Sequence, residues 1–168
     1  PIVDGIPVIL SDKKSIFVIN DFKKKKNTTW NLNPNKFYTN IKKYFPSIGL
    51  NIKAKENYKK LINLLPKNSK ILVIGGSIKG EGMEEIYANS SFQIINSDVS
   101  FGQKTNLISD GHDIPFANNI FDCVICQAVL EHVVDPFRCV EEIHRVLKPK
   151  GLIYAETPFM QQVHMKQY

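Results

Sequence analysis

The amino-acid sequence predicts an α/β fold with a doubly wound, mostly parallel β-sheet. From residue 53 onward, apolar segments of strand length alternate with segments whose apolar residues recur at helical spacing, as in successive βαβ units. The first strand-like segment, KILVIGG at residues 70–76, has no polar alternation, which indicates a strand covered on both faces. Ligands of such sheets bind at the carboxyl ends of the strands, beside the point where the strand order reverses.

The first 52 residues predict an N-terminal extension with short strands and a Lys/Asn-rich linker. PIVDGIPVIL predicts two extended segments around a turn at Asp4-Gly5, since this dipeptide favours turns. SIFVIND, residues 15–21, predicts another short strand, and KKKKNTTWNLNPN, residues 23–35, predicts a solvated linker. The α/β domain then occupies residues 53–168.

Within the domain, helices and strands are expected in alternation. The first helix stops at Pro66, because proline cannot continue it. A Pro-Lys-Gly turn is expected to close the last helix, whose apolar side chains at helical spacing are Phe137, Val140, Ile143, Val146 and Leu147. In chain order the expected elements are a helix in 54–70, a strand in 70–76, a helix in 82–90, a strand in 92–98, a short strand in 105–116, a strand in 120–132, a helix in 136–151 and a strand in 152–159.

Composition restricts the class of protein. The chain has 168 residues, of which 43% are apolar, enough for one domain with a true core. No apolar run approaches the length needed to cross a bilayer, and no signal-peptide pattern opens the chain. Three cysteines do not form a disulfide framework, so we expect a reducing, cytoplasmic location.

Charge is distributed unevenly along the chain. Residues 1–70 hold 15 Lys, no Arg and four acidic side chains, a net charge of +11, whereas residues 71–168 have a net charge of −5. A basic half can bind nucleic acid, but Arg, the preferred reader of bases and phosphates, is absent from it. We therefore interpret the lysines as solvated surface residues and expect no nucleic-acid partner.

The loop after the first strand indicates which ligand is expected. A dinucleotide site needs a glycine at the second loop position so that the backbone can approach a pyrophosphate, but the pattern here is Gly75-x-Ser77-x-x-Gly80. S-adenosyl-L-methionine has an ammonium, a sulfonium and no phosphate. It therefore suits the negative charge that follows the loop better than a pyrophosphate does, the charge being that of Glu81, Glu84 and Glu85.

Further motifs lie downstream: HDIPF at 112–116, FDCV at 121–124, LEH at 130–132 and EIHRVLKPKG at 142–151. Together they resemble motifs of the class I S-adenosyl-L-methionine-dependent methyltransferases, in particular the methyltransferase-11-like group. The resemblance implies a Rossmann-like fold, S-adenosyl-L-methionine as cofactor and no metal. It also implies two strands beyond the fifth, so we expect a sheet truncated after its fifth strand and a methyltransferase domain, residues 53–168, that lacks its C-terminal part.

The resemblance assigns the methionine and ribose ends of the cofactor. Gly75, Gly76 and Ser77 match the glycine-rich loop that holds the methionine end. Asp98, followed by Val99, matches the acidic residue that binds the ribose, where one carboxylate can accept from both hydroxyls.

The resemblance also assigns the adenine and methyl ends. Asp113 and the backbone of Ile114 match the adenine-binding loop, and Gln127 and Ala128 match the segment beneath the transferable methyl. One departure concerns the methionine ammonium, because Val73 stands where the family usually has an acidic residue. A glutamate of the cluster at residues 81–85 could replace it.

Catalytic and acceptor-binding candidates follow the fourth and fifth strands. His132 is the candidate general base, and Glu131, Gln161 and His164 are candidate contacts to the acceptor. A structural, hydrogen-bonding role for His132 remains open beside the catalytic one.

Cys123 and Cys126 spell C-x-x-C, a spacing that also occurs in zinc and redox sites. Residues three apart on a strand point to opposite faces. We therefore expect both side chains in the core and no metal site.

These observations predict a methyltransferase that uses S-adenosyl-L-methionine and methylates a small-molecule or sugar-like biosynthetic acceptor. Two alternatives remain open. One is a Rossmann oxidoreductase that binds NAD(P), and the other is a non-catalytic module that binds S-adenosyl-L-methionine or nucleic acid.

Overall fold

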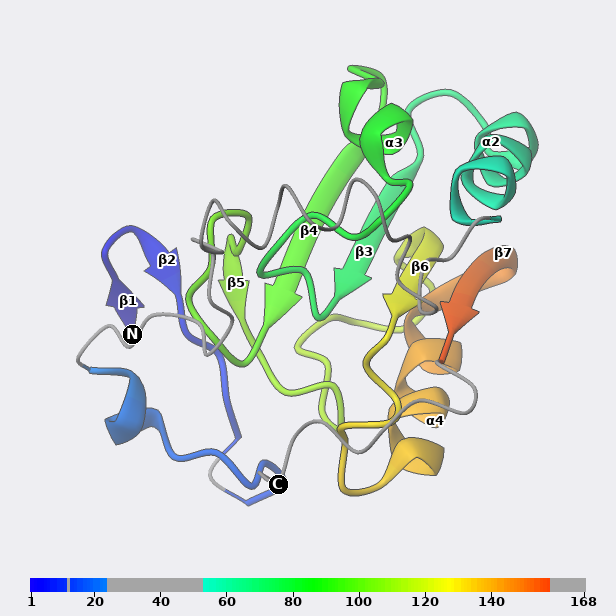
Figure 1. Cartoon of the computed structure of the whole chain (residues 1–168). Coiled ribbons are helices and arrows are strands. Elements are labelled where there is room, and N and C mark those ends of the chain that lie inside the picture. Colours follow the sequence, from blue (N-terminus) through cyan, green and yellow to red (C-terminus); the bar gives the residue numbers. More distant parts are fainter. Residues whose placement is uncertain (12, 24–52, 158–168) are drawn as a thin grey trace, which may run out of the picture.

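A computed structural model describes residues 1–11, 13–23 and 53–157. Its centre is a five-stranded sheet in the order β5-β4-β3-β6-β7, and every pairing in it is parallel (Figure 1). All five strands therefore end at the same edge of the sheet, which we call the carboxyl edge. The strands are β3 (Lys70–Ile74), β4 (Gln93–Asp98), β5 (Leu107–Ile108), β6 (Phe121–Gln127) and β7 (Leu147–Glu156).

The strand order reverses beside β3. The chain places β4 and β5 on one side of β3, then crosses to place β6 and β7 on the other side. Residues 71–74 of β3 are paired on both sides and buried, as their unbroken apolar run predicts. The predicted doubly wound, parallel, Rossmann-like architecture is confirmed.

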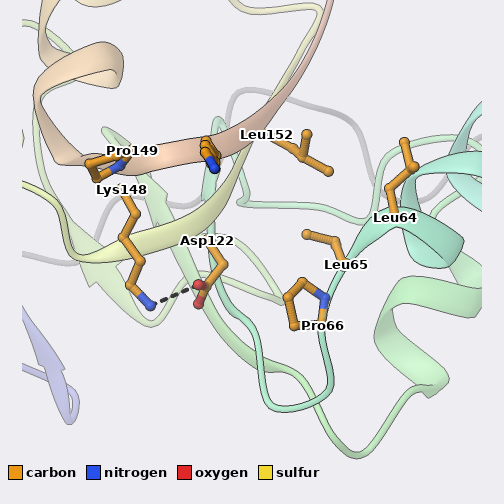
Figure 2. A pocket seen from close by; sticks show the side chains of 9 residues that line it. Leu64, Leu65, Pro66, Asp122, Lys148, Pro149 and Leu152 are labelled. Carbon is orange, nitrogen blue, oxygen red and sulfur yellow. Dashed lines mark hydrogen bonds and ion pairs between the residues drawn. The ribbon is translucent and has the colours of Figure 1, made fainter.

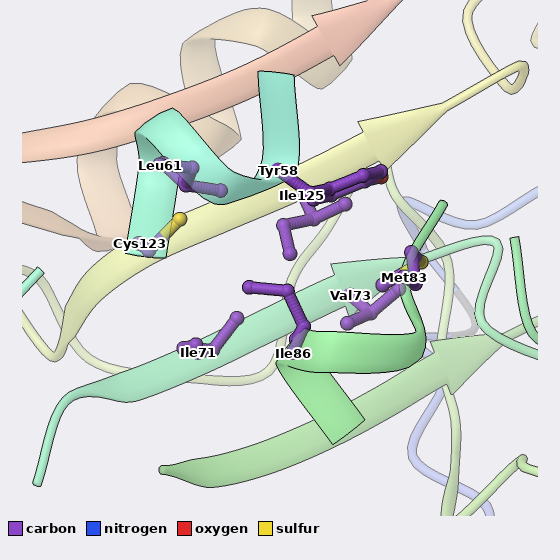
Figure 3. Packing of buried hydrophobic residues seen from close by; sticks show 8 residues of the cluster. All are labelled: Tyr58, Leu61, Ile71, Val73, Met83, Ile86, Cys123 and Ile125. Carbon is purple, nitrogen blue, oxygen red and sulfur yellow. The ribbon is translucent and has the colours of Figure 1, made fainter. Parts of the chain in front are cut away.

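Helices cover both faces of the sheet. α2 (Ala54–Leu64) and α3 (Glu84–Ala88) pack on one face in the cluster that Figure 3 shows, where Leu61 lies beside Cys123 and Ile86 lies beside Ile71. α4 (Pro136–Val146) packs on the other face. Within the described ranges, none of the helices has the length and apolarity to cross a bilayer.

The packed face of α4 differs from the predicted one. Cys139, Ile143 and Val146 are buried, whereas Phe137 and Val140 are 82% and 44% exposed. Cys139, Ile143 and Val146 are spaced four and three residues apart and so form a single stripe. Val140, three residues before Ile143, lies at the border of this stripe, and Phe137 lies outside it. The sequence has apolar residues on more than one side of this helix. Which side is buried depends on where the sheet lies.

α4 passes directly into β7 without the predicted intervening turn. Leu147 already pairs with Phe121, and the register then jumps so that Leu152 pairs with Cys123. Residues 148–151 therefore bulge from the paired strand. The Pro-Lys-Gly segment lies in this bulge, where Lys150 has a φ of 65°, so the predicted turn before the strand is wrong.

The N-terminal segment, residues 1–11 and 13–23, begins with a short hairpin. β1 (Ile2–Val3) and β2 (Ile6–Pro7) are antiparallel, and Asp4 and Gly5 have positive φ values of 49° and 79°, as hairpin turns of two residues require. The predicted turn is therefore confirmed.

The strand predicted at residues 15–21 is wrong. A 3-10 helix, η1 (Ile19–Phe22), occupies its second half. The Phe17 amide donates to Ser15 Oγ at 3.0 Å, which turns the chain, and Phe22 is buried against Phe101. The apolar residues here therefore belong to a packed cluster and not to a sheet. The predicted linker at residues 23–35 lies almost entirely outside the described residues.

The C-x-x-C pair lies inside β6 with its side chains on opposite faces, as predicted. Cys123 belongs to the cluster under α2 and α3, and Cys126 belongs to the cluster under α4. Burial raises the pKa of both thiols to about 12. Within the described part of the chain, no group of three or more His, Cys, Asp or Glu side chains is placed to hold a metal ion.

We expect Cys123 and Cys126 to resist alkylation in the native protein, because the thiolate is the reactive form and burial suppresses it. Mass spectrometry after iodoacetamide treatment, with and without urea, measures this. Lys13→Cys supplies an exposed control thiol that must react in the native state. Native labelling of β6 at the rate of the control would contradict the core assignment.

Candidate functional site

The glycine loop follows β3 at the carboxyl edge. Gly75 has a φ of +72°, and a Cβ there would overlap the Val129 side chain just beyond β6. Gly76 donates its amide to Ser97 O of β4 at 3.0 Å. The loop therefore lies between the ends of β4 and β6, and position 75 accepts only glycine.

Asp98 connects the loops that follow β3 and β4. Its Oδ2 accepts from the Ser77 amide at 2.9 Å. Its Oδ1 accepts from the Ser100 amide and hydroxyl, both at 2.8 Å. The predicted ribose residue thus stands at the carboxyl edge beside the glycine loop, while Ser77 is itself only 3% exposed and Val99 is half-buried.

The loop after β5 is held by α4. The Ile114 amide donates to Glu142 Oε2 at 2.8 Å, and Arg145 Nη2 donates to Ile114 O at 2.8 Å. The predicted adenine-binding amide is thus engaged within the protein. The Asp113 carboxylate, 25% exposed, lies 3.2 Å from Lys14 Nζ of the N-terminal segment.

Gln127, at the end of β6, is fixed by several partners. Its Oε1 accepts from the Tyr58 hydroxyl at 3.2 Å, and its Nε2 donates to Glu81 O at 3.1 Å and to Glu156 Oε1 at 2.8 Å. The next residue, Ala128, has a φ of 53°, a conformation that L-residues other than glycine rarely adopt and that concentrates at functional sites.

The sequence interpretation missed Glu156 and Tyr58. Glu156 is the β7 partner of Gln127 in register, and its Oε2 accepts from the Tyr154 hydroxyl at 2.5 Å. Because Glu156 is a polar residue near the end of the fifth predicted strand, the sequence could have indicated it as a site residue. Nothing local indicates that Tyr58, on a helix 69 positions earlier, reaches the same amide.

Asp110 was also missed. It is 2% exposed and accepts from Ser15 Oγ at 2.6 Å, from the His112 amide at 2.9 Å and from His112 Nδ1 at 2.7 Å. The imidazole proton is on Nδ1, because Nε2 accepts from the Asp135 amide. Burial raises the pKa of Asp110, but these hydrogen bonds outweigh burial and hold it below its ordinary value.

The candidate catalytic and acceptor residues are only partly described. His132 Nε2 lies 3.8 Å from Glu131 Oε1, with side chains 23% and 20% exposed, on the turn after β6. Gln161 and His164 lie outside the described residues. The general-base role of His132 and the acceptor contacts stay predictions.

The carboxylates after the glycine loop are partly paired. Glu84 lies 3.2 Å from Lys79, and Glu85 lies 3.5 Å from Lys59. The hydrogen bonds of Glu84, to its own backbone and to Lys79, lower its pKa. Negative charge at this end of the loop is therefore reduced but not removed, since Glu81 is exposed.

A shallow depression of about 330 Å³ lies at the opposite, amino-terminal end of the sheet (Figure 2). Asp122 in it accepts from Lys148 Nζ at 2.7 Å and from the Lys70 amide at 2.9 Å. These contacts join the starts of β3 and β6 to the bulge of β7. The depression therefore contains none of the residues assigned to the site.

Comparisons with known proteins agree with this geometry. Residues 77–155 match the sequence family described as Methyltransferase domain. The demethylmenaquinone methyltransferase of Paenarthrobacter aurescens is 34% identical over 83 residues, 43% of this chain and 33% of that protein. A suspected S-adenosyl-L-methionine-dependent methyltransferase from Methanococcus maripaludis matches with a TM-score of 0.50 and 21% identity, over 77% of this chain and 68% of that chain. The 4+2-cyclase SpnF matches with a TM-score of 0.52 and 19% identity, over 67% and 48%.

These matches confirm the resemblance inferred from the motifs. The sheet has the class I methyltransferase fold, and residues 77–155 carry the sequence pattern of the methyltransferase domain. The structural matches at 19% and 21% identity bear on the fold alone. The matched segments make up 9–33% of the curated relatives, so this chain spans at most a third of their length.

We expect Gly80→Ala to disturb the Gln127 amide, because a Cβ at residue 80 would overlap Gln127 Oε1. Overpacking of this kind costs about 1–3 kcal/mol, measured as the free energy of unfolding in urea. Gly111→Ala is the matched control, since its nearest neighbour, Cys139 Sγ, is at an ordinary 3.4 Å. Equal stability of the two variants would contradict the tight fit of Gln127 on the glycine loop.

Glu142 should make stability depend on pH. The hydrogen bond from Arg145 lowers the pKa of the Glu142 carboxyl in the folded protein. Its stabilisation is therefore complete above the ordinary carboxyl pKa and is lost as pH falls through the depressed value. We expect Glu142→Gln to lower the free energy of unfolding at neutral pH, with a deficit that shrinks in acid. Urea unfolding across a pH series measures this, with the exposed Glu141→Gln as control. A deficit that stays constant with pH would refute the assignment.

Proposed function

We propose that this chain binds S-adenosyl-L-methionine at the carboxyl edge of the sheet and transfers its methyl group to a small-molecule acceptor. The observation that carries the proposal is the hydrogen bond from the Ser77 amide to Asp98 Oδ2, 2.9 Å. It joins the glycine loop to the carboxylate at the end of β4, within the segment that matches the methyltransferase domain.

The residues present suit this cofactor. Gly75, with a φ of +72°, lets the loop turn sharply at the carboxyl edge. A carboxylate has about four lone-pair sites, and Asp98 accepts three hydrogen bonds. One ribose hydroxyl can therefore bind directly, and the second can bind if the Ser100 hydroxyl turns away.

When bound, the cofactor supplies an electrophilic methyl group on a sulfonium. The work of the chain is then to position the reacting groups and to accept the proton of the acceptor. Gln127, immobilised by its partners, would support the methyl end, and Ala128 would hold the backbone of this turn. His132 is the proposed proton acceptor, with Glu131 beside it.

The acceptor class rests on resemblance. One relative is named demethylmenaquinone methyltransferase, and the acceptor in that name is a small molecule. We propose a small or sugar-like biosynthetic acceptor for this chain as well.

One alternative deserves a separate test: cofactor binding without methyl transfer. It is favoured by the structural match to a protein named as a cyclase, which shows that this fold serves other reactions. A dinucleotide is a weaker alternative. Its loop needs the backbone at the second position to approach a pyrophosphate, but here that position is Ser77, which is 3% exposed.

We expect Asp98→Ala to weaken binding of S-adenosyl-L-methionine and of its demethylated product about tenfold or more, because hydrogen bonds to a charged group contribute about 1.5–3 kcal/mol each. Isothermal titration of both ligands, and of NAD, into the wild-type protein and the variant measures this. Both adenosyl ligands should weaken alike, since the ribose is common to them.

Two controls separate binding from folding. Asp98→Asn keeps the size of the side chain but only one of its two acceptor oxygens, so it can hold the Ser77 hydrogen bond or the Ser100 hydrogen bonds but not both, and Asp122→Ala removes a carboxylate at the other end of the sheet. An unchanged dissociation constant in Asp98→Ala would exclude the ribose assignment, and tight binding of NAD alone would exclude the cofactor. Transfer of a labelled methyl group to a panel of small acceptors distinguishes the methyltransferase from the binding module.

A further inference from the structure

The N-terminal segment pairs with the outer side of β5 and reaches the carboxyl edge of the sheet. The Ile9 amide donates to Ile108 O at 2.9 Å, and Val8 forms a parallel bridge with Ile108. In Figure 1 the blue segment adjoins β5 and continues past the ends of the strands. Residues outside the sheet-forming domain thus reach the edge at which the cofactor is proposed to bind.

An apolar cluster anchors this segment. Val8, Phe22, Phe101 and Ile108 are each at most 8% exposed and pack together. The Phe22 and Phe101 rings lie 6.3 Å apart, a distance typical of aromatic pairs. The segment is therefore held in one position relative to the loops after β4 and β5.

Ser15 connects the N-terminal segment to the loop after β5. Its Oγ accepts from the Phe17 amide at 3.0 Å, which directs its proton to Asp110 Oδ2 at 2.6 Å. Asp110 is 2% exposed and begins the turn that leads to Asp113 and Ile114. On its other side the same loop is fixed by Glu142.

A buried carboxylate must keep its hydrogen bonds, because an unsatisfied one costs far more than the bond itself contributes. Without the Ser15 hydroxyl, the donors that remain to Asp110 among the described residues are the amide and Nδ1 of His112. The carboxylate is then expected to turn toward water and to move the backbone of residues 110–113, whereas Ile114 stays held by Glu142 and Arg145. The ion pair of Lys14 with Asp113 is too exposed, at 61% and 25%, to prevent this.

We propose that Ser15 is a positioning residue of the cofactor site, which acts through Asp110 to hold the adenine-side loop in its binding conformation. The proposal rests on the proposed function. It adds to the site a residue of the N-terminal extension, whereas the sequence predicted that all cofactor-binding residues lie in the domain at residues 53–168.

Isothermal titration with S-adenosyl-L-methionine, its demethylated product and 5′-methylthioadenosine tests this. We expect Ser15→Ala to weaken all three about tenfold, since the hydrogen bond to a buried charge is lost and the adenosine is common to the ligands. Ser15→Thr keeps a hydroxyl and should restore binding. Lys13→Ala, an exposed neighbour, should bind as the wild type does.

A stability control separates positioning from a structural role. Ile71→Val, at the start of β3 in the cluster under α2 and α3, should lower the melting temperature and leave the dissociation constants unchanged. If Ser15→Ala behaves in the same way, the proposal is overturned and the proposed function stands. If the wild type binds none of the three ligands, both fall.

Discussion

The position of β3 between two parallel neighbours is the constraint on which the molecule depends. Its register with β4 and with β6 runs from Ile71 to Ile74 on both sides, and a strand paired in this way must be apolar on both faces. Because both neighbours run parallel to it, the loops that follow all three strands meet at one edge. The contacts of Gly75 with Val129 and of Ser77 with Asp98 are consequences of this pairing.

The polar residues at the carboxyl edge form a rigid base. Gln127 joins α2, the glycine loop and β7 through Tyr58, Glu81 and Glu156, and Asp110 joins β5 to the N-terminal segment. Within the described residues, every buried side-chain nitrogen and oxygen has a hydrogen-bond partner. These hydrogen bonds fix the side chains before a ligand binds, and the Ser100 hydroxyl is the group expected to turn when the ribose binds.

The N-terminal segment has a second effect, on the edge of the sheet. β5 is short and would expose unpaired backbone groups, which invites pairing with other chains. The Ile9 amide occupies Ile108 O and the cluster around Phe22 covers the strand. Protection of the edge and support of the adjacent loop therefore come from the same segment of the chain.

The sequence by itself determined the type and order of the helices and strands from residue 53 onward and the residues of the motifs. Those signals are local: the apolar run of β3, the helical spacing in α2, the Asp4-Gly5 turn and the glycine loop each act over a few residues. Only the tertiary structure decided which face of α4 is buried, that residues 15–21 serve a packing cluster, and that Ser15 meets Asp110 across 95 positions. These contacts depend on how the sheet arranges segments that are far apart in the sequence, and a local sequence pattern does not specify that arrangement.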